Sequence, residues 1–244
     1  MMKKLLFTLL TYMMLTTVVW GHDAMYFYNQ GVQSSLANRK IDYFTKALRL
    51  NPNLVEAYEK RGFHYYYQRR FDNAIQDYTR AIELKPDDSV AYQMRGLAYL
   101  KKGDLEGATD SLSRAIELDP KMASAYAARA EAYRLKGMAE EAIRDATTAI
   151  HSRGNERTTA NAYATRAKTY QQLGYETLSD ADFNKSFELD PRYVLYRYLA
   201  STASLESVRR MGLFGIIALL FVGIFQLSLR APRKKGSTDS THLG

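Results

Sequence analysis

The sequence predicts an all-α fold in which pairs of helices repeat along the chain and stack into a solenoid. The first observation is a phrase that reads RAIELKP at residues 80–86 and returns as RAIELDP at residues 114–120, 34 residues later. The second is that proline closes each of four copies of this phrase, at Pro52, Pro86, Pro120 and Pro191. Because proline lacks an N–H group and clashes with the preceding helical turn, each copy ends a helix. One helical phrase repeated at a fixed spacing is typical of a repeat architecture.

Four consecutive units of two helices each are expected, at residues 55–88, 89–122, 123–156 and 160–193. In the first helix of each unit, two tyrosines seven residues apart lie on one face, with a small residue between them. The pairs are Tyr58 and Tyr65, Tyr92 and Tyr99, Tyr126 and Tyr133, and Tyr163 and Tyr170. Glycine marks the turn between the two helices of three units, at Gly103, Gly137 and Gly174. Since one helix pair cannot bury its own apolar face, stacked copies are needed to build a continuous core.

These marks resemble the tetratricopeptide repeat, a helix–turn–helix of about 34 residues with alternating aromatic and small residues and a closing proline. Residues 22–54 are expected to form a degenerate N-terminal repeat. Its second helix, at residues 39–50, is recognisable, whereas residues 24–36 lack the aromatic and glycine marks. In the last unit Ser179 and Ser186 replace two alanines. The resemblance implies a right-handed superhelix whose concave groove holds peptides or partner domains.

An arginine recurs before the small residue of each first helix, at Arg61, Arg95, Arg129 and Arg166. Sixteen residues after three of these stand Asp77, Asp145 and Asp182, and Ser111 follows Arg95 at the same spacing. We interpret each arginine and aspartate as a partly buried ion pair inside one unit, because the two partners recur together. The alternative is a site for an anionic ligand.

The resemblance also implies which residues face the groove, namely those on the side of each first helix turned away from its own partner helix. They are Glu56, Glu59, Phe63, Tyr66, Tyr67, Gln93, Leu97, Leu100, Lys101, Glu131, Arg134, Lys168, Gln171 and Gln172. Five of them are apolar or aromatic and are predicted to form one cluster: Phe63, Tyr66, Tyr67, Leu97 and Leu100. This cluster either anchors a partner or packs against the degenerate repeat. The basic and asparagine side chains with which some family members hold a C-terminal carboxylate are absent from the matching positions.

Neither catalysis nor a cofactor is expected. The chain has no cysteine, which excludes disulfides and thiolate metal sites, and its four histidines lack metal-ligand spacing. No glycine-rich phosphate loop or nucleophilic serine motif occurs. The formal net charge is +8, but Lys3 and Lys4 contribute two of these charges and residues 209–244 contribute five. Nucleic acid and small-molecule substrates are therefore not expected as partners.

Two apolar segments predict attachment to a membrane. Residues 1–21 have the lysines, apolar core and small-residue exit of a signal peptide, and the alternative is an uncleaved anchor. Residues 211–229 contain no charge and are long enough for a transmembrane helix. Between the repeats and this span, residues 194–210 are predicted to form a capping helix, and residues 230–244 form a basic polar tail.

The expected function is a membrane-anchored scaffold that binds a partner peptide or protein in its groove. The basic tail favours a cytoplasmic C-terminus, which places the repeats outside the cytoplasm, in the bacterial periplasm. A tail-anchored protein with cytosolic repeats is the alternative topology. A constitutive subunit of a membrane complex and an enzyme are the alternative functions.

Overall fold

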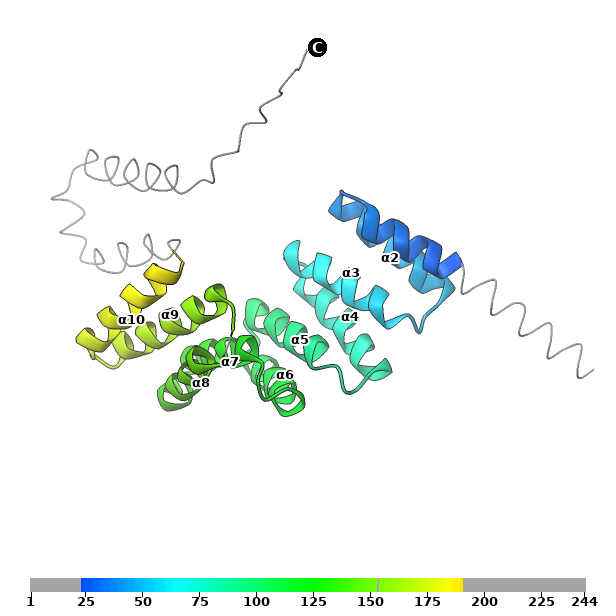
Figure 1. Ribbon diagram of the computed structural model, residues 1–244. Coiled ribbons are helices and arrows are strands. Elements are labelled where there is room, and N and C mark those ends of the chain that lie inside the picture. The colour runs from blue at the N-terminus through cyan, green and yellow to red at the C-terminus, as the bar shows by residue number, and fades with distance from the viewer. Residues whose placement is uncertain (1–22, 153, 191–244) are drawn as a thin grey trace, which may run out of the picture. The chain divides into compact units, whose positions relative to one another are not determined.

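In the computed structural model of the protein, residues 23–152 and 154–190 are described, and all regular structure in them is helical (Figure 1). The all-α prediction is thereby confirmed for this part of the chain. Residues 23–33 are helical. The helices that follow are α2 (Ala37–Leu50), α3 (Val55–Tyr67), α4 (Phe71–Leu84), α5 (Ser89–Lys102), α6 (Leu105–Leu118), α7 (Ala123–Leu135), α8 (Ala139–His151), α9 (Glu156–Gln172) and α10 (Glu176–Leu189).

The helices pack as consecutive pairs that follow one another in chain order (Figure 1). The pairs are α3 with α4, α5 with α6, α7 with α8 and α9 with α10, and the second helix of each pair also packs against the first helix of the next. The first helices α3, α5, α7 and α9 additionally contact one another. Their surface directed away from the second helices is called the first-helix face below.

A left-handed residue makes the turn inside each pair. Gly103, Gly137 and Gly174 have φ angles of 92°, 79° and 79°, and the prediction that they mark these turns is confirmed. In the first pair the same place is taken by Arg69, with φ of 60°. Because a side chain disfavours this conformation, Arg69 carries a conformational cost that the glycines avoid.

Small residues allow the two helices of a pair to approach closely. A Cβ atom added at Gly96 would lie 2.6 Å from Cγ of Leu112, and one added at Gly62 would lie 3.2 Å from the Tyr78 ring. Alanines occupy the facing positions of the second helices, and Ala74, Ala81, Ala108, Ala115, Ala142 and Ala149 are fully buried. The core therefore consists of successive close helix contacts, at which large side chains of one helix pack against small residues of the neighbouring helix.

The helix at residues 23–33 packs against Phe44 of α2, and these two helices are called the N-terminal pair below. This pair differs from the prediction that it lacks the glycine mark. A Cβ atom added at Gly31 would lie 2.6 Å from the Phe44 ring. Gly31 therefore allows its helix to approach Phe44 closely, as Gly62 allows α3 to approach Tyr78. Gly31 precedes Phe44 by 13 residues, whereas Gly62 precedes Tyr78 by 16. The connection is three residues shorter, which shifts the glycine out of the 34-residue register and hides it from a periodicity argument.

The predicted ion pairs are confirmed in three of the four units. Arg61, Arg129 and Arg166 each donate two hydrogen bonds to the aspartate sixteen residues later, at distances from 2.6 to 3.0 Å. The arginine side chains are 17% exposed and the aspartates 5–9% exposed. In the second unit Arg95 donates instead to the Ser111 hydroxyl, at 3.1 Å. These buried, bidentate contacts fix the two helices of a pair against each other.

The same arginines also link neighbouring units. Their Nη1 groups donate to a hydroxyl on the second helix of the preceding unit, at distances from 2.9 to 3.5 Å. The acceptors are Thr45, Thr79, Ser113 and Thr147. Each guanidinium further lies over one or two of the repeated tyrosine rings. One arginine per unit therefore stabilises both the packing of the two helices within its pair and the packing between neighbouring units.

The boundary between the last two predicted units also differs in the structure. The third unit was expected to extend to Glu156 and the fourth to begin at Ala160, but α9 begins at Glu156. The Asn155 side chain accepts a hydrogen bond from the Thr158 N–H at 2.8 Å and caps the helix there. The three inserted residues therefore lengthen α9 at its N-terminus.

The predicted segments 1–21, 194–210, 211–229 and 230–244 lie outside the described residues. Within residues 23–152 and 154–190, no helix combines the length and the apolar character that a membrane span needs.

Candidate functional site

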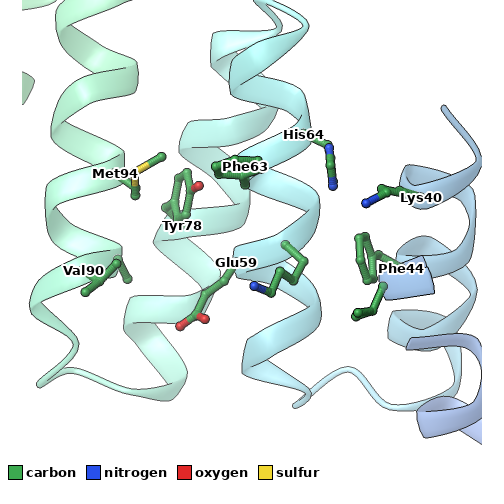
Figure 2. Close-up of a pocket in the computed structure, with 11 residues that line it drawn as sticks. Lys40, Phe44, Glu59, Phe63, His64, Tyr78, Val90 and Met94 are labelled. Carbon is green, nitrogen blue, oxygen red and sulfur yellow. The ribbon is translucent and has the colours of Figure 1, made fainter. Parts of the chain in front are cut away.

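A groove opens at the N-terminal end of the first-helix face, where side chains of α3 and α5 meet side chains of the second helices α2 and α4. It has a volume of about 440 Å³, within the range of roughly 300–1,000 Å³ found for ligand sites. The lining side chains come from α2, α3, α4 and α5 and from the helix before α2 (Figure 2). They are Val32, Lys40, Phe44, Glu59, Lys60, Phe63, His64, Tyr78, Val90, Ala91 and Met94. This set is called the groove pocket below.

Aromatic rings form the wall of the groove pocket and continue beyond it along α3. His64 stacks on Phe44 with 6.1 Å between centroids, and Phe63 meets the His64 ring edge-on at 5.4 Å. Phe63 also packs against Tyr67 at 4.5 Å. Phe63 is 41% exposed and Tyr67 is 66% exposed, although both are large aromatic residues. The rings hold one another in place while presenting apolar surface to solvent.

Three basic side chains, one histidine and two lysines, lie beside these rings. Lys40 on α2 and His64 on α3 face each other across the gap between the two helices (Figure 2). Lys60 precedes His64 by four residues and so lies on the same face of α3. Burial, together with the charges of Lys40 and Lys60, lowers the pKa of His64. The imidazole is therefore neutral at pH 7, and the positive charge here comes from the two lysines.

Glu59 is the carboxylate of the groove pocket, and it is hydrogen-bonded to Asp88. Burial, the hydrogen bond and the neighbouring charge of Asp88 raise the pKa of Glu59 to about 7. Asp88 accepts hydrogen bonds from the Ala91 N–H and from Lys85, both at 3.0 Å. Burial opposes their effect, but these bonds lower the pKa of Asp88. Asp88 thus holds the negative charge as the N-cap of α5, and Glu59 carries a proton over part of the physiological range.

A second polar cluster lies farther along the first-helix face, on α7 and α9. Arg134 donates two hydrogen bonds to the Glu131 carboxylate, at 2.8 and 2.7 Å, and the Thr165 hydroxyl donates a third at 3.3 Å. Burial lowers the pKa of Lys168, Glu131 raises it, and Arg134 and Lys101 lower it further. Arg134 and Lys168 therefore both act on the Glu131 carboxylate, and Lys101 acts on Lys168.

The first turn of α9 brings one more cation to this face. Burial raises the pKa of the Tyr66 hydroxyl, and Arg157 opposes this effect, which places its charge near α3. Arg157 belongs to the residues by which α9 starts earlier than expected.

The predicted apolar cluster of five residues is divided in the structure. Phe63, Tyr66 and Tyr67 form one group of rings, with 5.4 Å between the centroids of Tyr66 and Tyr67. Leu97 and Leu100 instead pack against the core around Leu112, Ala125 and Ala128. These leucines therefore stabilise the contact of α5 with α6 and α7 while remaining half-buried, as Tyr66 does.

The remaining predicted groove residues are distributed along the face. Gln93 donates a hydrogen bond to the Ser124 hydroxyl at 2.6 Å and joins α5 to α7. Gln171 is exposed near the end of α9. The structure therefore brings Glu59, Phe63 and their ring neighbours together, and it places Glu131 and Lys168 in the separate cluster.

The tetratricopeptide repeat family matches the chain at residues 55–88, 77–109 and 160–193, and a further TPR repeat match covers residues 96–137. These matches coincide with the helix pairs described above. The chain is a tetratricopeptide repeat protein. No curated protein is significantly similar to it in sequence.

Several solved structures have a similar fold. The MamA protein shares 24% identity with this tetratricopeptide repeat protein, at a TM-score of 0.58, over 74% of this chain and 95% of MamA. YrrB, named as a TPR protein with an unusual peptide-binding site, shares 20% identity at a TM-score of 0.58, over 72% of this chain and 92% of its own. TTC0263, a thermophilic TPR protein of Thermus thermophilus, shares 20% identity at a TM-score of 0.57, over 75% and 99%. At these identities the likeness is one of fold.

Sequence reasoning missed the part of the groove pocket that the N-terminal pair supplies. Val32, Lys40 and Phe44 lie in the segment interpreted as degenerate, for which no groove residue is predicted. A signal was present, because Phe44 precedes the buried Tyr78 by one period of 34 residues. In the part of the chain that the structure describes, no group of three His, Asp or Glu side chains is placed to hold a metal ion.

Proposed function

We propose that this tetratricopeptide repeat protein is a scaffold that binds an extended segment of a partner protein along its first-helix face. The observation that carries the proposal is the groove pocket with its exposed rings of Phe63 and Tyr67. Exposed aromatic side chains beside a concave site are the residues that most often dominate protein binding. YrrB has a similar fold, and its name assigns it a peptide-binding site, so a stack of this type can hold a peptide.

The test is capture of the native partner by a variant that loses both exposed rings. Phe63→Ser with Tyr67→Ser should reduce co-purification from native membranes by about tenfold or more, as expected for two central aromatic contacts. The matched control is Tyr175→Ser with Leu178→Ser, which removes equally exposed apolar groups at α10. Both double variants should melt close to the parent temperature. Equal capture by the two variants contradicts the proposal, and capture that survives a high-salt wash identifies a constitutive subunit.

The scaffold is proposed to be anchored in a membrane with its repeats outside the cytoplasm. Support comes from the sequence: residues 1–21 have the pattern of a signal peptide, and residues 211–229 are uncharged and bracketed by basic residues. A reporter that is active only in the cytoplasm, fused after Tyr193 with the N-terminus intact, should be inactive. An active fusion supports the tail-anchored alternative.

Residues 194–210 are proposed to cover α10 and to bring the repeats close to the bilayer. Phe187 on α10 is 37% exposed, whereas Ile82 and Ile116, at the same position in earlier units, are 7% and 8% exposed beneath the next pair. A further helix would bury Phe187 in the same way. Slow proteolysis between Leu195 and Ser207 in the intact protein is the expected result, and rapid cleavage there contradicts it.

A further inference from the structure

We infer that the partner segment is acidic, with carboxylates on both sides of an aromatic or large aliphatic side chain that enters the groove pocket. This inference rests on the proposed function and specifies the chemistry of its partner. It follows from three features of the first-helix face: its charge balance, its uncompensated lysines and the position of its rings.

The charge of the first-helix face differs from that of the surrounding fold. Residues 23–190 contain 24 Lys and Arg and 24 Asp and Glu, so their formal charges balance. The basic residues that the structure or the repeat pattern assigns to this face and its groove pocket are Lys40, Lys60, Lys101, Arg134, Arg157 and Lys168. The acidic ones are Glu56, Glu59 and Glu131. Positive charge is therefore concentrated where a partner would lie, which favours an acidic one.

Three lysines of this face are not neutralised by an ion pair within the fold. Among the described residues, Lys40, Lys60 and Lys101 form none. Elsewhere in this part of the chain Lys85, Lys102, Lys136 and Lys185 each form one, and Lys46 and Lys121 form none. Glu59 does not compensate Lys60, because its carboxyl group is hydrogen-bonded to Asp88. The groove pocket thus offers two lysine ammonium groups to an incoming carboxylate.

The rings connect two positively charged parts of the surface. Phe63 lines the groove pocket with Lys40 and Lys60 and packs against Tyr67. Tyr67 packs against Tyr66, and the charge of Arg157 acts on the Tyr66 hydroxyl. An extended segment along this path meets cations, then apolar surface, then a further cation. The complementary sequence has carboxylates flanking an apolar side chain.

A nucleic acid fits this surface less well. Evenly spaced phosphates would meet the carboxylates of Glu56 and Glu131, and Glu131 is already held by Arg134. A nucleic-acid surface of this length would instead present a continuous basic stripe. Protein is therefore the partner class, and nucleic acid is an outcome of the test.

The experiment uses the full chain in detergent micelles and fluorescent synthetic peptides with blocked termini. One peptide has phenylalanine flanked by Asp and Glu, a second has Asn and Gln in their place, and a third has Lys. The acidic peptide should bind about tenfold more tightly than the amide peptide, because two partly exposed ion pairs together give roughly this factor. The lysine peptide should bind more weakly still, and raising the salt concentration should remove the difference.

Substitutions test whether the groove pocket lysines cause the difference in peptide affinity. Lys40→Gln with Lys60→Gln should lower the affinity for the acidic peptide by about tenfold and leave the amide peptide unchanged. The matched control is Arg49→Gln with Lys121→Gln, two exposed basic residues outside the groove pocket, which should change neither.

Three results overturn the inference. Equal binding of the acidic and amide peptides, with loss of both in Phe63→Ser, keeps the proposed function and refutes the acidic partner. Tighter binding of single-stranded DNA than of the acidic peptide refutes the partner class. Binding of none of the peptides refutes the inference and removes support from the proposed function as well.

Discussion

Replacing Asp145 with alanine should destabilise the stack by about 3 kcal/mol. Asp145 accepts hydrogen bonds from Arg129 at 2.6 and 3.0 Å, and the two side chains are only 7% and 17% exposed. The change leaves a largely buried guanidinium without its counter-charge, which typically costs about 3–5 kcal/mol. The lower end applies because Arg129 keeps its hydrogen bond to Ser113 and its contacts with the rings of Tyr126 and Tyr133.

The chain contains a matched control for this experiment. Arg95 occupies the same position one unit earlier, but its partner is Ser111, which accepts one hydrogen bond at 3.1 Å. Ser111→Ala removes a neutral acceptor and no charge, so it should cost only about 1 kcal/mol. Both variants remove the hydrogen-bond acceptor at the same position of the repeat, but only Asp145→Ala also removes a counter-charge.

Thermal melting of the full chain in detergent micelles, followed by far-UV circular dichroism, measures both. At about 2–4 °C per kcal/mol for a chain of this size, Asp145→Ala should lower Tm by about 6–12 °C and Ser111→Ala by less than about 4 °C. Equal shifts for the two variants would refute the reasoning, because the counter-charges would then contribute nothing beyond a neutral hydrogen bond.

Three smaller changes test other features of the stack by the same melting assay. Arg69→Gly should stabilise by about 1 kcal/mol, since it relieves the left-handed strain at φ of 60°, and no gain would show that this turn is unstrained. Ser186→Ala should stabilise by about 1 kcal/mol or more, because the buried Ser186 hydroxyl has no hydrogen-bond partner among the described residues; a loss would point to a missing partner. The raised pKa of Glu59, about 7 against an ordinary 4.5, makes its protonated form favour the folded state. That contribution to the free energy of unfolding is complete below pH 4.5 and is lost as pH rises through 7. Glu59→Gln should therefore reduce the decline of stability over this window. An unchanged pH profile of stability would contradict this prediction.

The periodic features of the fold could be predicted from the sequence. The closing prolines, the turn glycines and the Arg–Asp spacing each recur at a fixed interval, and one physical reason applies to every copy. The ion pair of Arg61 with Asp77 was expected on this basis, and the structure contains it. The hydroxyls that accept from these arginines, such as Thr45 and Thr79, also recur every 34 residues, so the same method applied to threonine and serine would have found them.

Features outside the period could not be predicted in this way. Gly31 lies three residues out of register because the first connection is shorter, and only the contact with Phe44 reveals its role. Leu97 and Leu100 share the helical face of Phe63 in sequence terms, but they pack against the core formed by α6 and α7 and are only partly exposed. Periodicity places a residue on a side of its helix, whereas the next unit decides whether that side is open.

The groove pocket shows the same limit. Lys40 and Phe44 come from one helix pair and Val90 and Met94 from another, two units apart in the chain. Their proximity depends on how the pairs stack, which the spacing of residues within one unit does not encode.

The central claim is that a partner segment lies on the first-helix face, and site-specific photo-crosslinking in the native membrane tests it most directly. A photoreactive amino acid at Phe63 should capture a partner protein, and the same amino acid at the exposed Gln76 on the second helix α4 should not. Capture at Phe63 that a soluble acidic peptide displaces is the result that this account predicts. Capture at Gln76 with none at Phe63 would contradict it.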